Sequence, residues 1–136
     1  MEKVIFGYCI GPDVQLDLAN RRLVNWSGDK NGGKLNKIIL RDTMLRLFTF
    51  LLENANGSVI PNEKILINVW DKYRLRSSNQ RLWQVMKELK FRLDSIGVPD
   101  DFIMRIESKG YYLKESMITT LYCVKHHDET LAEQTS

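Results

Sequence analysis

The sequence has few cysteines and no long hydrophobic run. Cys9 and Cys123 lie near opposite ends and have no partner at C-x-x-C spacing, so neither a disulfide scaffold nor a structural zinc site is expected. The most apolar stretch, residues 45–52, is interrupted by Arg46 and Thr49, and is far shorter than the roughly 20 apolar residues of a membrane span. The N-terminus has no apolar core or cleavage site typical of a signal peptide. These absences predict a cytoplasmic protein with reduced thiols.

Catalytic and cofactor motifs are also missing. There is no G-x-S-x-G motif, no metal-spaced cluster of His and Cys, and no oriented Cys–His pair, so we expect no enzyme, no cofactor and no small-molecule substrate. Residues 28–35 approach the phosphate-binding pattern G-x-x-x-x-G-K-[ST], but Leu35 replaces the hydroxyl that would hold magnesium, which favours a surface loop. His126 and His127 lie in a polar tail without further ligands, which favours a solvated segment over a metal site.

The composition is that of one folded domain with an uneven charge distribution. The 136 residues are 43% hydrophobic and 27% charged, which is enough apolar material for a core. The net charge is only +3, but residues 72–94 contain seven basic and two acidic residues. Residues 115–136 contain one basic residue and four acidic ones. The basic stretch therefore suits a polyanion, and the C-terminal segment does not.

Short strands open the chain. Residues 4–10 are apolar and β-branched, and residues 14–18 alternate apolar and polar side chains. Residues 23–26 and 37–40 supply two more strands, with a polar Gly-rich loop between them. The pattern predicts an N-terminal antiparallel sheet.

Three helices and a hairpin follow. A strongly apolar helix is predicted over residues 42–54, where Asn56-Gly57 follows as a stop, and a second helix is predicted with Pro61 in its first turn. Ser77 and Ser78 cap a third helix that reaches residue 95. Residues 102–106 and 111–113 then form a hairpin. We therefore predict an α+β fold, a winged helix-turn-helix with an N-terminal antiparallel sheet, three helices and a C-terminal β-hairpin wing.

The third helix has the chemistry of a DNA-reading element. Its apolar stripe consists of Leu82, Val85, Met86, Leu89 and Leu93. Gln80, Gln84 and Lys87 project from the opposite side, flanked by other polar residues. Gln can pair bidentately with adenine, and Arg or Lys with guanine, in a major groove that admits an α-helix. The alternative for this face is a merely solvated surface. We expect Trp83 and Phe91, which lie off the apolar stripe, to pack against the wing or the N-terminal sheet rather than intercalate DNA.

These elements resemble a known family over residues 14–113. The matching positions are Leu40, residues 51–53, Asn56-Gly57-Ser58-Val59-Ile60, Ile65-Leu66, Val69-Trp70, Ser77-Ser78 with Leu82, Met86, Leu89 and Leu93, and the ending Arg105-Ile106-Glu107-Ser108-Lys109-Gly110-Tyr111. In this order they resemble the OmpR/PhoB-type winged-helix DNA-binding domain. The closer resemblance is to the ToxR-like branch of bacterial transcription regulators, the CadC, ToxR and TcpP type.

The resemblance implies a sequence-specific regulator, an activator, that binds double-stranded DNA. It implies DNA-binding residues at Gln80, Arg81, Gln84, Lys87, Glu88, Arg105 and Lys109. It also implies that the connector after the second helix contacts RNA polymerase through Lys72, Tyr73, Arg74 and Arg76. Glu88 and Glu107 depart from the family pattern, since many members carry a basic residue there. These two residues are the best support for the alternative function, a winged-helix protein-interaction module without autonomous DNA binding, and the basic stretch of residues 72–94 opposes it.

We expect residues 1–114 to form the DNA-binding domain and residues 115–136 to form a C-terminal extension or linker. Three arrangements are open for its apolar part, residues 117–124: an added strand, pairing with another copy, or a lead into a linker toward a membrane. A single small module reads few base pairs, so a homodimer or a partner regulator is expected on DNA. The chain fits either the cytoplasmic piece of a membrane-tethered regulator or a freestanding relative.

Overall fold

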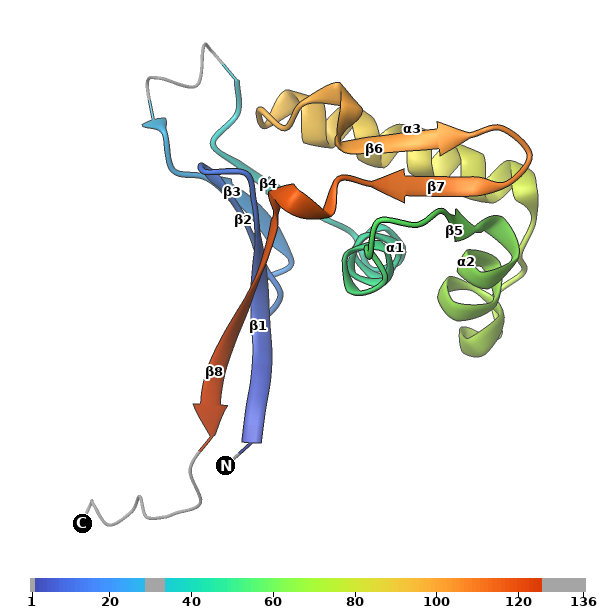
Figure 1. Cartoon of the computed structure of the whole chain (residues 1–136), viewed down its shortest axis with the longest axis horizontal. Helices are drawn as coiled ribbons and strands as arrows, with labels where there is room; N and C mark the ends of the chain where they lie inside the picture. The colour runs from blue at the N-terminus through green and yellow to red at the C-terminus, as the bar shows by residue number, and fades with distance from the viewer. Residues whose placement is uncertain (1, 29–33, 126–136) are drawn as a thin grey trace.

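Two antiparallel sheets flank three α-helices in the computed structural model, which describes residues 2–28 and 34–125 (Figure 1). The elements in chain order are β1 (Glu2–Ile10), β2 (Val14–Asp17), β3 (Arg22–Asn25), β4 (Lys37–Ile39), α1 (Asp42–Glu53), β5 (Ile60–Pro61), α2 (Asn62–Val69), η2 (Asp71–Tyr73), α3 (Asn79–Ser95), η3 (Asp100–Phe102), β6 (Ile103–Ile106), β7 (Gly110–Leu113), η4 (Glu115–Met117) and β8 (Ile118–Lys125). The predicted winged-helix order is confirmed. Residues 29–33 of the expected surface loop, and the expected solvated tail with His126 and His127, lie outside the described residues.

The N-terminal sheet has the strand order β4-β3-β2-β1-β8. Alternation sets its buried face, because Val14, Leu16 and Leu23 point into the core while their neighbours are partly exposed. The last strand comes from the C-terminal extension: β8 pairs with β1 from Ile10↔Ile118 to Glu2↔Lys125. Of the three arrangements open for this segment, the structure shows the added strand.

β1 and β8 continue beyond the rest of the sheet as a two-stranded ribbon. β2 pairs with β1 only over residues 7–10, so residues 2–5 of β1 have β8 as their one strand partner in the described chain. The ribbon projects away from the helices, and its far end is the pair Glu2 and Lys125 (Figure 1). A β-bulge between Ile5 and Gly7 marks the place where it leaves the sheet.

Helix α1 forms the centre of the core, as its sequence predicts. Met44, Leu47, Phe48, Leu51 and Leu52 are buried. Leu45 and Phe50 are only partly buried, so the helix leaves one side open to solvent. None of the helices in the described residues is both long and apolar enough to cross a membrane.

Helix α2 begins one residue later than expected. Pro61 is its N-cap and not a residue of its first turn, because β5 holds Pro61 opposite Gly110 of β7. β5, β7 and β6 form the second sheet in that order, and the β6–β7 hairpin is the wing. A side chain on residue 110 would overlap the carbonyl oxygen of Ile60, so glycine is required there.

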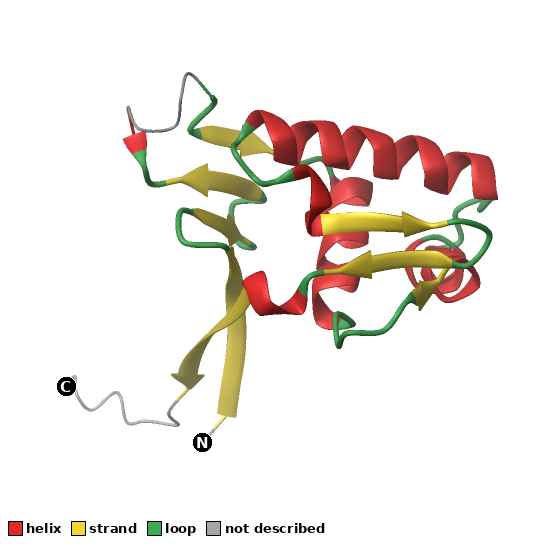
Figure 2. Cartoon of the chain, turned by 45° about the horizontal axis from the view of Figure 1, so that its top comes forward, coloured by secondary structure: helices red, strands yellow, loops and turns green. Residues whose placement is uncertain are grey.

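Helix α3 extends from α2 and the wing to the N-terminal sheet. Its C-terminal end reaches the N-terminal sheet, where the buried Asn25 donates from Nδ2 to the carbonyl oxygen of Ile96 at 2.8 Å. Its N-terminal end lies beside α2 and the turn of the wing (Figure 2). The face of α3 opposite the core is thereby framed by the wing.

Candidate nucleic-acid interface

Helix α3 starts at a conventional N-cap. Ser78 is extended, and its Oγ accepts a hydrogen bond from the backbone N–H of Arg81 at 3.0 Å. Arg81 is thus fixed in the first turn of the helix. The N-cap expected at Ser77 and Ser78 is confirmed for Ser78.

The residues expected to read bases lie together on the outer side of α3. Gln80, Gln84 and Lys87 are exposed, at the spacing i, i+4, i+7 that places side chains on one helix face. The apolar stripe on the other side is buried in full: Leu82, Val85, Met86, Leu89 and Leu93. The buried stripe fixes the rotation of the helix, so these three side chains face solvent.

A groove of about 240 Å³ separates α3 from the wing. Trp83, Met86 and Lys87 line it from the helix, and Arg105 and Tyr111 line it from the wing. The Lys87 ammonium lies 4.9 Å from the centre of the Trp83 ring, a cation–π contact that positions the lysine. Lys87 and Arg105, which are 18 residues apart in sequence, are therefore brought to the same groove.

The two aromatic residues of α3 behave differently. Trp83 borders the wing and is 45% exposed, in keeping with the expected packing. Phe91 is 70% exposed. The expectation that Phe91 packs against the wing or the N-terminal sheet is wrong, because the helix turns it onto the same outer face as Gln84 and Lys87.

A second groove of about 240 Å³ lies where the N-termini of α2 and α3 meet the wing. Asn62 and Asn79 line it from the helices, and Arg105 and Ser108 from the wing. The Oδ1 atom of Asn62 is buried in this structure without a hydrogen-bond partner. The N-terminus of α3 and the Arg105 guanidinium suit an anion, whereas the Asn62 Oδ1 is an acceptor and calls for a hydrogen-bond donor. Asn62 and Asn79 were not predicted from the sequence; each is the first residue of its helix as the structure shows it, α2 and α3.

Glu88 lies at the side of α3 between two arginines. Arg41 donates both of its terminal nitrogens to the carboxylate at 2.9 Å, and Arg92 lies 3.4 Å from one oxygen. The hydrogen bonds from Arg41 are the main reason that the pKa of Glu88 falls below its usual value. The carboxylate is neutralised where a free one would repel a phosphate.

The wing carries the other expected contacts near its turn. Arg105, Glu107, Ser108 and Lys109 are exposed. Ser108 has a positive φ of 64°, which makes the tight turn. The backbone carbonyl of Lys109 accepts from the N–H of Asn62 at 3.0 Å, so the turn is attached to the start of α2. Burial raises the pKa of Tyr111, and the neighbouring Arg105 opposes that shift.

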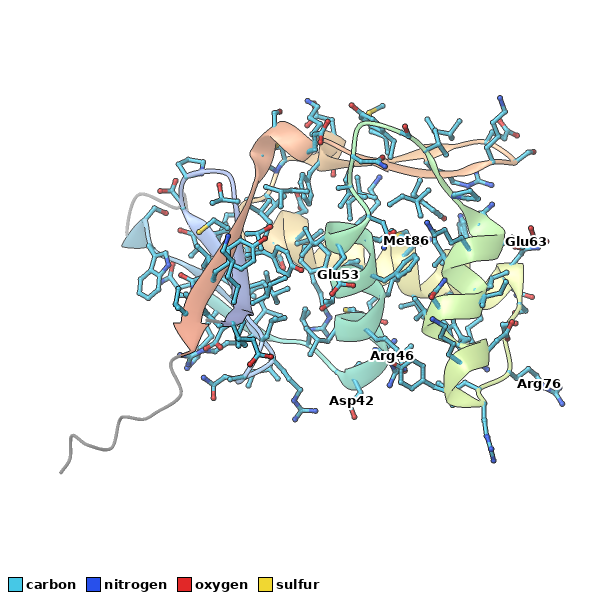
Figure 3. The ribbon with its side chains drawn as sticks, turned by 60° about the horizontal axis from the view of Figure 1, so that its bottom comes forward. Asp42, Arg46, Glu53, Glu63, Arg76 and Met86 are labelled. Carbon is cyan, nitrogen blue, oxygen red and sulfur yellow. The ribbon has the colours of Figure 1, made fainter. Side chains whose placement is uncertain are left out.

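The connector between α2 and α3 is exposed but attached at one point. Lys72, Tyr73, Arg74 and Arg76 all face solvent. The Arg46 guanidinium of α1 stacks on the Tyr73 ring at 3.8 Å and donates to the carbonyl of Val69 at 3.4 Å. Figure 3 shows Arg46 on α1 and Arg76 further along the connector. Lys72 and Tyr73 line a separate hollow beside α1 and not the α3–wing grooves, whereas Arg76 lies three residues before Asn79 at the start of α3.

Comparisons with known proteins agree with this architecture at the level of fold. No protein-family model matches the sequence, and no curated protein matches it. Among solved structures, the DNA-binding domain of E. coli CadC superposes with a TM-score of 0.67 at 17% identity, covering 88% of this chain and 100% of that domain.

Two further structures are similar. The C-terminal domain of the nisin resistance regulator NsrR, a lantibiotic response regulator, has a TM-score of 0.54 at 21% identity and covers 69% of this chain and 84% of its own. The Klebsiella pneumoniae RstA DNA-binding domain, solved in complex with the RstA box, has a TM-score of 0.54 at 16% identity and covers 83% and 97%. The chain therefore has the winged-helix fold of OmpR/PhoB-type and CadC-type DNA-binding domains, and the resemblance noted in its sequence is confirmed as a likeness of fold.

Proposed function

We propose that this chain binds double-stranded DNA with sequence preference, as a bacterial transcription regulator of the ToxR-like kind. The observation that carries the proposal is the outer face of α3, where Gln80, Gln84 and Lys87 are exposed side by side and no carboxylate lies between them. Helix α3 has 17 residues, or about 26 Å at 1.5 Å per residue, and an α-helix fits the major groove. The two Gln side chains are suited to adenine and Lys87 to guanine.

Phosphate contacts come from the residues that frame this face. Arg81 lies in the first turn of α3, and Arg105 and Lys109 lie on the wing. The groove with Asn62 and Asn79 adds the N-terminus of α3, which favours a phosphate oxygen. These contacts give affinity and orientation, whereas the α3 side chains give base preference.

Glu88 has a positioning role in this proposal. Its bidentate pair with Arg41 joins α3 to the start of α1, and its charge is balanced by two guanidiniums. The carboxylate therefore costs less DNA affinity than an unpaired acid at this position would. Glu107 has no such partner within the described residues, and it is the best support for the alternative function as a protein-interaction module.

The connector Lys72, Tyr73, Arg74 and Arg76 is proposed to contact RNA polymerase when the domain sits on a promoter, which would make the protein an activator. The position of Lys72 and Tyr73 supports this, because they line a hollow beside α1 and not the α3–wing grooves. A homodimer or a partner regulator on adjacent half-sites would enlarge the DNA contact of so small a module. Such a regulator acts in the cytoplasm, where bacterial DNA lies.

Capture of random genomic fragments by the purified protein tests the proposal. The recovered fragments are sequenced, and the best one is titrated against a scrambled duplex over a salt series. We expect a shared site, a clear preference over the scrambled duplex and an affinity that falls steeply with salt. Absence of binding to either duplex at low salt would instead support the interaction module.

A further inference from the structure

A groove distant from α3 and the wing has features of a binding site. About 500 Å³ of space lies between the β1–β8 ribbon and the C-terminal end of α1. Ile5 and Tyr8 line it from β1, Thr120 and Tyr122 from β8, and the carboxylates of Glu53 and Glu115 from α1 and η4. Figure 3 shows Glu53 on the side of α1 that faces the ribbon.

The groove is electrostatically negative and unneutralised. Neither Glu53 nor Glu115 forms an ion pair within the described residues. Glu53 also occupies the last turn of α1, which has no basic residue and carries the negative end of the helix dipole. A cation that entered the groove would pair with the carboxylates and would interact favourably with the negative end of the helix dipole. Lys3 already lies on the Tyr122 ring at the rim, 5.2 Å from its centre.

The hydroxyl of the buried Tyr8 also favours a ligand that donates a hydrogen bond. Tyr8 is 1% exposed, and in the described chain its hydroxyl has no hydrogen-bond partner. Among the described residues, the polar side-chain atom that is both fully buried and without a partner is Asn62 Oδ1. The Tyr8 hydroxyl also has no partner, so it must keep some contact with solvent. The small exposed part of Tyr8 is therefore its hydroxyl, which opens into the groove. A donor that reached this depth would find an acceptor there.

The edge of the sheet beside the groove is open. β8 is the last strand of its sheet, and its outer edge has no strand beside it in the part of the chain described. Residues 118–124 include no charged residue and no proline, the groups by which proteins usually protect an exposed edge. Such an edge can accept an extended peptide, whose backbone pairs with the strand and whose alternate side chains reach one face.

We propose that this groove and the β8 edge together form a docking site for an extended segment of a partner protein that carries a lysine or arginine. The segment adds as a strand beside β8. Its cationic side chain enters the groove toward Glu115, Glu53 and the Tyr8 hydroxyl, and apolar residues two positions away pack on Tyr122 and Ile118. The site goes beyond DNA binding and does not depend on it, because none of its residues lines the α3–wing grooves.

An NMR titration of the ¹⁵N-labelled full chain tests the site. The probe is the peptide Ser-Thr-Val-Thr-Lys-Thr-Val-Thr-Ser, and its controls are the same peptide with Glu in place of Lys and one N-methylated at alternate residues to block strand pairing. We expect the lysine peptide to shift the amide signals of residues 118–124, and both controls to bind at least tenfold more weakly. Equal binding of the Glu peptide, shifts confined to other elements, or no shift up to millimolar concentration would overturn the proposal.

Protein variants separate the contributions. Glu53→Gln and Glu115→Gln should each weaken the lysine peptide about fivefold, the upper range for a solvent-accessible ion pair. Tyr8→Phe keeps the buried ring and should also weaken binding, whereas the matched control Glu63→Gln on α2 should not. Folding of each variant is checked by its amide spectrum without peptide.

Two other occupants are distinguished in the same experiment. N-acetyl-lysine methylamide tests a free amine, and binding as tight as that of the peptide would show a small-molecule site and refute strand addition. Sedimentation of the protein without peptide tests a second copy. A dimer that protects the amides of β8 from exchange would show that another copy of this chain occupies the edge, and would refute the partner segment.

Discussion

The salt dependence of DNA binding is the sharpest consequence of the proposed interface. Each cation that neutralises a phosphate contributes about −0.9 to the slope of log K against log salt. Three cations are assigned to phosphate contacts in the proposed interface: Arg81, Arg105 and Lys109. None of them is paired with an acid within the described residues, whereas Arg41 and Arg92 are already bound to Glu88. The slope should therefore reach about −2.7, an affinity loss of about 40-fold between 50 and 200 mM salt.

Single substitutions show how much each residue contributes to this slope. Lys109→Ala should reduce the slope to about −1.8, so that the loss over the same salt range is about 12-fold, and should weaken specific and scrambled duplexes alike. Gln84→Ala should leave the slope unchanged and cost ~1 to 3 kcal/mol on the specific site alone. Lys37→Ala removes a charge from the exposed face of β4, on the sheet away from the wing, and serves as the control.

Fluorescence anisotropy of labelled duplexes at five salt concentrations is sufficient for this test. If Lys109→Ala and Lys37→Ala change the slope equally, the wing does not contact phosphate. If Gln84→Ala weakens both duplexes to the same degree, α3 does not read bases, and the assignment of its outer face is wrong.

Three further predictions concern the scaffold. Ser78→Ala should lower the free energy of unfolding by about 1 kcal/mol, read from urea denaturation, while Ser78→Thr should retain most of it. Gly110→Ala should be far more damaging, since its methyl would overlap the Ile60 carbonyl and separate β5 from β7; a melting temperature within a degree of the parent would contradict this packing. Because the folded pKa of Glu88 is depressed, its pair with Arg41 should stabilise the fold above the ordinary carboxyl range and lose this effect as pH falls through the folded pKa. Glu88→Gln should be less stable than the parent at neutral pH and should approach it in acid; a constant difference from pH 7 to pH 2 would refute the linkage.

The elements near one another in sequence could be predicted, and the reasons are local. Helix α3 has a capping serine, a regular apolar stripe and a Gly-Val-Pro ending, each of which acts within a few residues. The wing has two short apolar strands and a turn. The outer position of Gln80, Gln84 and Lys87 follows from the helical period alone. Phe91 lies on the same row, and applying that period to it strictly would have predicted its exposure.

The features that could not be predicted depend on contacts between distant residues. The sequence of residues 117–124 predicts a strand but not its partner, which lies more than a hundred residues earlier in β1. The ion pairs of Glu88 show the same difference between local and distant contacts. Its pair with Arg92, one helical turn away, could be predicted, but its pair with Arg41, 47 residues away, could not. The anion-suited groove at Asn62 and Asn79 needs α2, α3 and the wing to be placed together.

Helix α1 places the two proposed sites in one rigid unit. Its first end meets α3 through Arg41 and Glu88, its middle holds the connector through Arg46 and Tyr73, and its last turn supplies Glu53 to the ribbon groove. The buried side of α1 packs in the single core, so none of these contacts can shift alone without disturbing that packing. A partner segment beside β8 would lie at the opposite end of the molecule from the wing (Figure 1). It would therefore leave α3 free to enter DNA, and the two ligands should bind together without competition.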